Sequence, residues 1–189
     1  THNLVGAFEA DLFLSSNYQD VQKALESGFA AASIVGSSSK DSHETQLRIA
    51  FDGDAVIFSD ESEKIFREKG IDAFEENERK SANVELKAGP FKCFLKSLHK
   101  IQSAFPVENN PIRTALVTAR SAPSHKRVIH TMREWGIRID ESFFLGGLDK
   151  GVFLKEFSAD IFFDDQHSHC KSASQYVPTG HVPNGISNS

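Results

Sequence analysis

The sequence predicts an α/β protein: a Rossmann-like parallel sheet with helices on both faces and a small helical cap inserted into the chain. Short apolar runs alternate with helical patterns through most of the 189 residues. That alternation favours parallel strands, because a parallel pair needs a crossover connection and the crossover is usually a helix. One highly charged stretch interrupts the alternation and predicts the cap. Polar or acidic side chains directly follow several of the apolar runs and predict a ligand site.

Each expected strand is a short run rich in apolar or β-branched residues and bounded by polar or turn residues. The run at residues 47–51 (LRIAF) is typical, and it leads without a break into Asp52-Gly53-Asp54. The polar stretch before it, residues 36–46, is expected to be a loop. By this criterion the strands are residues 10–14, 29–35, 47–51, 114–117, 143–145, 161–163 and 179–182.

The expected helices are based on caps, apolar periodicity and glycine stops. Asn17 can cap a helix over residues 18–27 that Gly28 ends. Pro123 suits the first turn of a later helix, and residues 91–105 carry apolar side chains at helical spacing. The helices expected after the first are residues 60–70, 71–88, 91–105, 121–135 and 150–157.

The charged stretch defines the expected domain organisation. Residues 60–102 interrupt the strand–helix rhythm, and we expect them to form the helical cap. Residues 1–59 and 103–189 then form the Rossmann-like core. Within the cap, candidates to face a substrate are Phe74, Glu78 and the turn Gly89-Pro90-Phe91, against the alternative that a charged helix is simply solvated.

Composition excludes several kinds of protein. A net charge of −5 opposes general binding to nucleic acid, which rewards clustered Lys and Arg. No apolar run approaches the roughly 20 residues of a membrane span, and no secretory leader pattern is present. The two cysteines, Cys93 and Cys170, have no framework spacing and suit a reducing compartment. We therefore expect a cytoplasmic protein that binds neither nucleic acid nor a membrane.

Two acids at the end of an expected strand are the first candidates for chemistry. Asp52 and Asp54 directly follow a buried run, where carboxylates are costly without a partner. One carboxylate can attack phosphorus while its neighbour moves a proton for the leaving group and then for water. Gly53 between them lets the backbone approach a ligand closely.

Three further features follow in order along the chain. Thr118 precedes Ala119-Arg120-Ser121, where a hydroxyl and free N–H groups suit a phosphate oxygen. Lys150 begins an expected helix and could neutralise a nucleophile and a transferred phosphoryl group. Asp164 and Asp165 follow an apolar strand and offer the oxygen ligands that Mg²⁺ prefers. Because open parallel sheets bind ligands at the carboxyl ends of their strands, we expect all four features to share one site.

Simpler interpretations exist for single members of this set. Thr118 alone is more often a helix cap, and Lys150 alone is more often a solvated side chain. The segment at residues 166–170 (QHSHC) could hold a soft metal, but helix positions two apart do not share a face and zinc requires a fourth ligand. Cys93 lies in an amphipathic helix and is expected to be a small core residue rather than a nucleophile.

Taken together, the four features resemble the motifs of the haloacid-dehalogenase-like superfamily. Longer stretches closely resemble the cytosolic 5′-nucleotidase type I family, and they are spread over nearly the whole chain. These stretches are DLFLSSNYQDVQKALESGFAAA (11–32), AFDGDAVIFSDESE (50–63), ALVTARSAP (115–123), FLGGLDKGVFL (144–154) and ADIFFDDQ (159–166). The resemblance implies a Rossmann-like core and Mg²⁺-dependent hydrolysis of nucleoside 5′-monophosphates, with AMP as the usual example.

The resemblance also implies residue roles. Asp52 would be the nucleophile that becomes aspartyl-phosphate, and Asp54 the general acid and then base. Thr118 and Lys150 would hold the phosphoryl group, with Lys155 as a second candidate for the lysine. Mg²⁺ would be held by Asp52, Asp54 (through its backbone carbonyl), Asp164 and Asp165. Substrate contacts are expected from Thr118, Ala119, Arg120 and Ser121.

Several alternatives stay open at this stage. A phosphatase of the same fold could act on another small phosphate ester, and a phosphotransferase would share the aspartyl-phosphate. Family members carry a further segment upstream of the part that matches Leu4 onward, so the chain could also be an inactive nucleotide-binding fragment or a naturally short form. Assembly into a homo-oligomer is left open.

Overall fold

The computed structural model describes residues 5–36 and 45–188. Its strands form one seven-stranded sheet in the order β1-β2-β7-β6-β3-β4-β5. The strands are β1 (Leu12–Ser15), β2 (Ala30–Val35), β3 (Leu47–Phe51), β4 (Ile112–Thr118), β5 (Glu141–Phe144), β6 (Ile161–Asp164) and β7 (Thr179–His181). The α-helices are α1 (Tyr18–Glu26), α2 (Glu61–Lys80), α3 (Lys92–Gln102), α4 (His125–Glu134), α5 (Lys150–Phe157) and α6 (His167–Ala173).

The sheet is mostly parallel, which confirms the expected fold class. Every neighbouring pair from β7 to β5 runs in parallel, as does the pair of β1 and β2. The pair of β2 and β7 is antiparallel, so the expectation of a uniformly parallel sheet is wrong at this one junction. Apolar runs reveal where strands lie but carry no information about the direction in which two of them meet.

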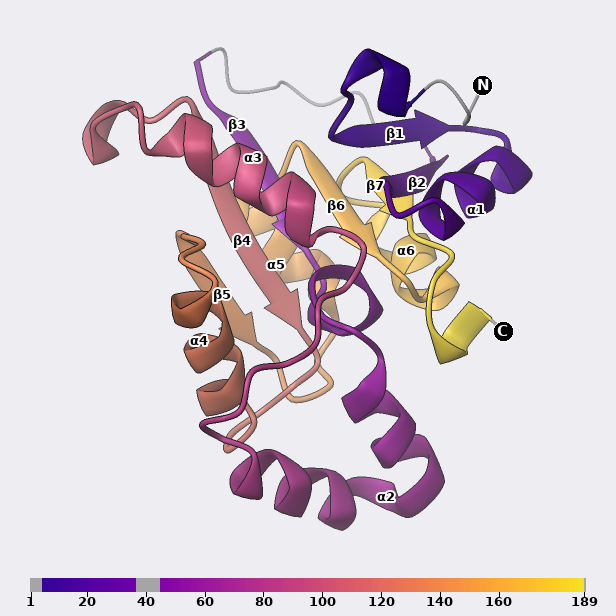
Figure 1. Cartoon of the computed structure of the whole chain (residues 1–189), viewed down its shortest axis with the longest axis vertical. Helices are drawn as coiled ribbons and strands as arrows, with labels where there is room; N and C mark the ends of the chain where they lie inside the picture. The colour runs from indigo at the N-terminus through magenta and orange to yellow at the C-terminus, as the bar shows by residue number, and fades with distance from the viewer. Residues whose placement is uncertain (1–4, 37–44, 189) are drawn as a thin grey trace.

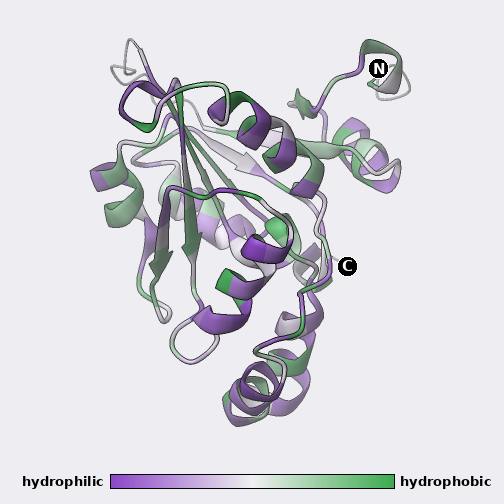
Figure 2. Ribbon diagram, turned by 60° about the vertical axis from the view of Figure 1, so that its left-hand side comes forward, coloured by the Kyte–Doolittle hydropathy of each residue, from purple (hydrophilic) through white to green (hydrophobic). Residues whose placement is uncertain are grey.

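Helices cover both faces of the sheet because successive strand residues point to opposite sides. On one face, Ile49 and Phe51 of β3 pack in the same cluster as α3 and α4. On the other face, Ala50 packs in a cluster with α5 and α6. Figure 2 shows hydrophobic residues concentrated on the central strands, while the projecting helix α2 is mainly hydrophilic. Both faces of β3 are therefore covered by apolar side chains, and polar side chains can reach a ligand only beyond its carboxyl end.

Helix α2 lies beyond the carboxyl ends of β3, β4 and β6 (Figure 1). It bends at Gly70, which adopts a φ of 80° and divides the helix into two halves. A positive φ favours glycine, and the expected helix break at this position is confirmed. The second half ends at Lys80, so the expectation of a helix up to residue 88 is too long.

Helix α3 belongs to the core layer although the expected cap, residues 60–102, includes it. Phe94, Leu95 and Leu98 of this helix are buried in the same cluster as Phe51 of the sheet. We therefore propose a narrower cap, residues 60–80, which comprises α2 and its N-cap. The apolar periodicity of α3 indicated burial correctly, but it could not indicate that the partner was the sheet.

Other element boundaries also differ from expectation. Helix α4 begins at His125 and not at residue 121, because residues 121–124 form a turn in which Ser124 N donates to Ser121 O. Helix α6 was not among the expected elements. The expected loop at residues 36–46 falls mostly outside the described residues. Cys93 is exposed, so its expected place in the core is wrong, because it lies off the buried face of α3.

Within the described residues, no helix combines the length and the apolar character that crossing a membrane requires.

Candidate active site

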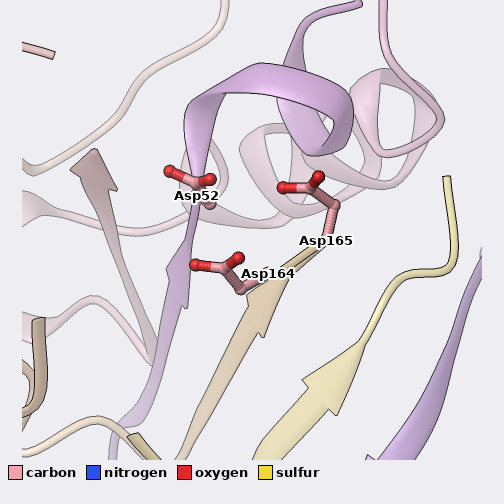
Figure 3. Close-up of side chains that lie close together, drawn as sticks. All are labelled: Asp52, Asp164 and Asp165. Atoms are coloured by element: carbon pink, nitrogen blue, oxygen red, sulfur yellow. The ribbon is translucent and has the colours of Figure 1, made fainter. Parts of the chain in front are cut away.

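Three buried carboxylates meet at the carboxyl ends of β3 and β6. These strands pair in parallel, with Phe51 opposite Phe163, so the residues that follow each strand lie side by side. Asp52 follows β3, Asp164 is the last residue of β6, and Asp165 comes next. One oxygen of each of the three lies within 4.8 Å of the others. Figure 3 shows these carboxylates gathered at the strand ends.

Lys150 places a positive charge between two of these carboxylates. Its Nζ lies 2.8 Å from Asp52 Oδ1 and 2.6 Å from Asp164 Oδ2. The lysine is the first residue of α5, and the side chain of Asp149 caps that helix. Lys155 is exposed further along the same helix. The structure therefore brings Lys150 to the acidic cluster, and it leaves Lys155 in solvent.

Burial and the shared lysine together set the charges of the cluster. Burial raises the pKa of Asp52 to about 7; the charge of Lys150 opposes this shift and that of Asp164 adds to it. Burial also opposes the ionisation of Asp164, yet Lys150 and the imidazole of His169 hold its pKa below the ordinary value. Burial disfavours the ammonium of Lys150, but Asp164 and Asp52 raise its pKa above the ordinary value. Lys150 therefore stays charged beside a carboxylate that ionises near neutral pH.

Asp165 is the member of the cluster that most needs a cation. Both of its carboxylate oxygens are buried, and neither has a hydrogen-bond partner among the described residues. Burial, followed by repulsion from Asp52 and Asp164, raises its pKa to about 9. Buried polar atoms without partners often mark an ion site, and a set of carboxylate oxygens is what Mg²⁺ prefers. The residues present therefore fit Mg²⁺.

A tight turn carries Asp54 from the end of β3 into the site. The turn is formed by Gly53–Ile57, in which Ala55 adopts a φ of 60°. It passes close to Thr118, because a Cβ on Gly53 would lie only 3.3 Å from Thr118 Oγ1. Glycine at this position therefore lets the backbone after the strand approach the end of β4.

Arg120 binds both carboxylate oxygens of Asp54. Its Nε donates to Asp54 Oδ2 at 2.8 Å, and its Nη2 donates to Oδ1 at 2.7 Å. Its Nη1 donates to Oε2 of Glu78, on the second half of α2, at 2.6 Å. Burial disfavours the charge of Arg120, but Asp54 and Glu78 raise its pKa above the ordinary value. The guanidinium therefore joins the cap to the turn that carries Asp54.

Thr118 and the three residues after it border the same site from β4. Thr118 is buried, and its Oγ1 accepts a hydrogen bond from Arg120 N at 3.2 Å. Ala119 is exposed and Ser121 is half-buried. The Thr118 hydroxyl therefore makes a local bond of the kind found at helix caps, and it also faces the turn after Asp52.

A pocket of about 280 Å³ lies between the strand ends and α2. Asp52, Asp54 and the segment 118–121 line it from the core side. Phe66 and Phe74 line it from α2, with their rings in edge contact at 6.2 Å. The volume is close to the lower end of the range for small-molecule sites. The nucleophile candidate and the expected substrate contacts therefore open onto one space.

The residues of the expected cap that were candidates for substrate contact lie in different parts of the structure. Phe74 lines the pocket, while Glu78 is almost fully buried among ion pairs, so neither substrate contact nor solvation describes it. Gly89 and Pro90 line a separate pocket, and Phe91 lies in the core. The Gly89-Pro90-Phe91 turn lies outside the pocket that Asp52 lines, and its two N–H groups donate to carbonyl oxygens of the turn after β3.

Two neighbours of the site were not expected from the sequence. The Nδ1 of His169 lies 3.3 Å from Asp164 Oδ2, although this histidine drew attention only through the soft-metal interpretation. Glu63 lines the pocket, and its Oε2 is buried without a hydrogen-bond partner among the described residues. Its position in the first turn of α2, soon after Asp52-x-Asp54, is the signal that could have revealed it. Cys170 is buried and its Sγ donates to Asp164 O at 3.4 Å.

Comparisons with known proteins identify the family of the chain. Human cytosolic 5′-nucleotidase 1B is 41% identical over an alignment of 175 residues, and the match covers 89% of this chain and 29% of that protein. The chain thus spans less than a third of the length of that curated relative. No solved structure matches. A family model for 5′-nucleotidases matches residues 1–189, so the expected resemblance is confirmed and the chain belongs to the 5′-nucleotidase family.

Proposed function

We propose that the chain hydrolyses nucleoside 5′-monophosphates, with AMP as the reference substrate, to nucleoside and phosphate in the presence of Mg²⁺. The observation that carries the proposal is the pairing of Asp52 with Lys150 Nζ at 2.8 Å, next to a pocket that Asp52 and Asp54 line. Family membership supports the nucleotidase activity. The human relative is named as a cytosolic enzyme, which supports a cytoplasmic location for this chain.

The first half of the reaction forms an aspartyl-phosphate. A carboxylate oxygen of Asp52 attacks phosphorus, and the bond between phosphorus and the 5′ oxygen of the nucleoside breaks. Asp54 enters the cycle as the neutral acid and gives its proton to that oxygen, so the nucleoside leaves as a neutral alcohol and Asp54 is left ionised. Lys150 stays charged throughout and offsets the negative charge that gathers around Asp52.

The second half releases phosphate and restores the site. Asp54, now ionised, takes a proton from a water molecule, and the resulting oxygen attacks the phosphorus of the aspartyl-phosphate. The bond between phosphorus and Asp52 breaks, and Asp52 returns as a carboxylate. One residue thus serves as acid and then as base, and no net proton is left on the protein.

Mg²⁺ bound by Asp52, Asp164, Asp165 and the backbone carbonyl of Asp54 would supply positive charge to the phosphate oxygens. The phosphate is further held by the Thr118 hydroxyl and by N–H groups of the segment 118–121, which line the pocket.

The outer part of the pocket suits a nucleoside. Phe66 and Phe74 present aromatic surface to the cavity, and stacking on aromatic rings is the usual way to hold a base without reading its identity. Arg120 lies 5.4 Å from the centre of the Phe74 ring, so the aromatic wall and the phosphate end are in contact. A nucleotide bound in this way reaches from α2 to the strand ends.

The test is phosphate release from AMP, CMP, IMP, deoxynucleoside monophosphates and a sugar phosphate, each with Mg²⁺ and with EDTA. We expect release from the nucleoside monophosphates that depends on Mg²⁺ and is absent in Asp52→Asn. Preference for the sugar phosphate would instead indicate a phosphatase for other small esters. No release from any ester by the folded protein with Mg²⁺ would reject the proposed activity and favour a binding fragment.

A further inference from the structure

Glu78 is a buried acid of the cap that is joined to Asp54 through Arg120. It sits on the second half of α2 and is 1% exposed. Its Oε1 accepts hydrogen bonds from Ser62 Oγ at 2.8 Å and from Arg127 Nη1 at 3.0 Å. Its Oε2 accepts from Arg120 Nη1 at 2.6 Å. A buried carboxylate that accepts from two arginines is held in one place, because moving it would leave unpaired charges in the interior.

Arg120 transmits that fixed position to Asp54. The guanidinium is planar, so its three donor groups have a fixed relation to one another. Two of them bind the two oxygens of Asp54, and the third binds Glu78. The two-pronged contact sets the plane of the Asp54 carboxyl group. Each carboxyl oxygen has two lone-pair sites, so one on each oxygen stays available for proton transfer.

We propose that Glu78 is a positioning residue for proton transfer: it anchors Arg120 and, through Arg120, orients the carboxyl group of Asp54 toward the 5′ oxygen of the substrate. The proposal rests on the proposed function, because it assigns Glu78 to the same reaction. In this proposal the cap lines the pocket and also fixes the orientation of a catalytic side chain. The correct docking of α2 becomes a condition for delivery of the proton.

The predicted effect is confined to the step in which the proton moves. When Asp52 forms its bond to phosphorus, the bond to the 5′ oxygen breaks and that oxygen takes the proton of Asp54. An alkoxide is a poor leaving group and needs this proton. A thiolate leaves without one, so an AMP analogue with sulfur in place of the bridging 5′ oxygen bypasses Asp54 while keeping the same base, sugar and phosphoryl group.

The experiment compares AMP with the bridging-sulfur analogue in Glu78→Gln, which keeps the shape of the side chain and removes its charge. The matched control is Glu76→Gln, two residues away on α2, where the side chain is exposed and pairs only with Lys80 among the described residues. We expect kcat/KM for AMP to fall about tenfold or more in Glu78→Gln, while the analogue loses less than about threefold. Glu76→Gln should match the wild type on both substrates.

The affinity for AMP distinguishes a positioning role of Glu78 from a merely structural one. In the inert Asp52→Asn background, adding Glu78→Gln should leave the affinity for AMP within about twofold, because proton transfer contributes nothing to ground-state binding. Equal losses of kcat/KM on AMP and on the analogue, or a parallel loss of affinity, would overturn the proposal and mean that Glu78 only holds the cap in place.

A second variant covers the case in which Glu78→Gln does not fold. Ser62→Ala removes one donor to Glu78 and touches neither Arg120 nor Asp54. It should show the same selectivity for the oxygen substrate with a smaller loss, and an unselective loss would again reject the proposal. A wild-type protein that releases no phosphate from AMP would instead reject the proposed function, so the two failures are distinguishable.

Discussion

Replacing Asp165 by Asn removes one buried negative charge and keeps the shape of the side chain. The pKa of Asp165 is raised from 3.8 to about 9 by burial and by repulsion from its acidic neighbours. Between about pH 4 and pH 9 the folded protein without a cation therefore binds a proton on this group that the unfolded chain does not. The free energy of unfolding then falls as pH rises, by about 1.4 kcal/mol per pH unit for one proton.

The size of the effect follows from that slope. At pH 7, keeping Asp165 protonated in the folded state costs about 4 kcal/mol relative to the unfolded chain. Asparagine avoids this cost, but its buried amide would leave polar atoms unpaired at a cost of about 1–3 kcal/mol. We expect a net gain of about 1–3 kcal/mol in EDTA, which for a protein of this size raises Tm by at least about 2 °C.

The assay is thermal unfolding of wild type and Asp165→Asn at pH 5, 7 and 8, in EDTA and in Mg²⁺. The wild type in EDTA should lose stability as pH rises, and the variant should lose less. Added Mg²⁺ should raise the Tm of the wild type and shift the variant much less, because a metal ligand is gone. Asp72→Asn, which alters an exposed acid on α2, serves as the control. A variant less stable than wild type in EDTA at pH 8, or an undiminished Mg²⁺ shift, would refute the reasoning.

Three further substitutions test the site and the packing next to it. Lys150→Met should lower kcat by about 10²–10³-fold because the charge beside the nucleophile is lost. Lys155→Met, on the exposed face of the same helix, should retain full activity. Equal kcat values for the two variants would contradict the role given to Lys150. Gly89→Ala should destabilise the fold by about 1–3 kcal/mol, measured by urea unfolding, because its Cβ would lie 2.4 Å from two backbone carbonyl oxygens. Phe74→Ala should raise KM for AMP about tenfold, because stacking of the base on the ring is lost. Phe105→Ala, which alters an exposed ring, is the control. An unchanged KM in Phe74→Ala would mean that the base does not stack on Phe74.

The sequence revealed where the candidate site lies on the sheet because the signal there is local. Asp52, Thr118 and Asp164 each lie at the end of an apolar run, and parallel strands place such ends at one edge. Lys150 was found for a similar reason, since it begins the helix that precedes β6. The preference for Lys150 over Lys155 matches the structure, in which only the former contacts Asp52.

The connection from cap to core could not be predicted in the same way. Arg120 is 42 residues from Glu78, and Arg127 is 49 residues from it, so no local pattern joins them. A charged helix indicates solvent exposure on average, and α2 follows that rule except at its buried residues Ser62, Phe74 and Glu78. The placement of α3 against the sheet was missed for a related reason, because periodicity identifies an apolar face but not the surface that covers it.

The central claim is that Asp52 carries the phosphoryl group. The most direct measurement mixes the Mg²⁺-loaded protein with AMP labelled in its phosphate, quenches in acid within a single turnover, and locates the label in the peptide that contains Asp52, with steady phosphate release measured in parallel. We predict label on that peptide in the wild type, and neither label nor release in Asp52→Asn. Phosphate release by Asp52→Asn at a rate near that of the wild type would contradict the account.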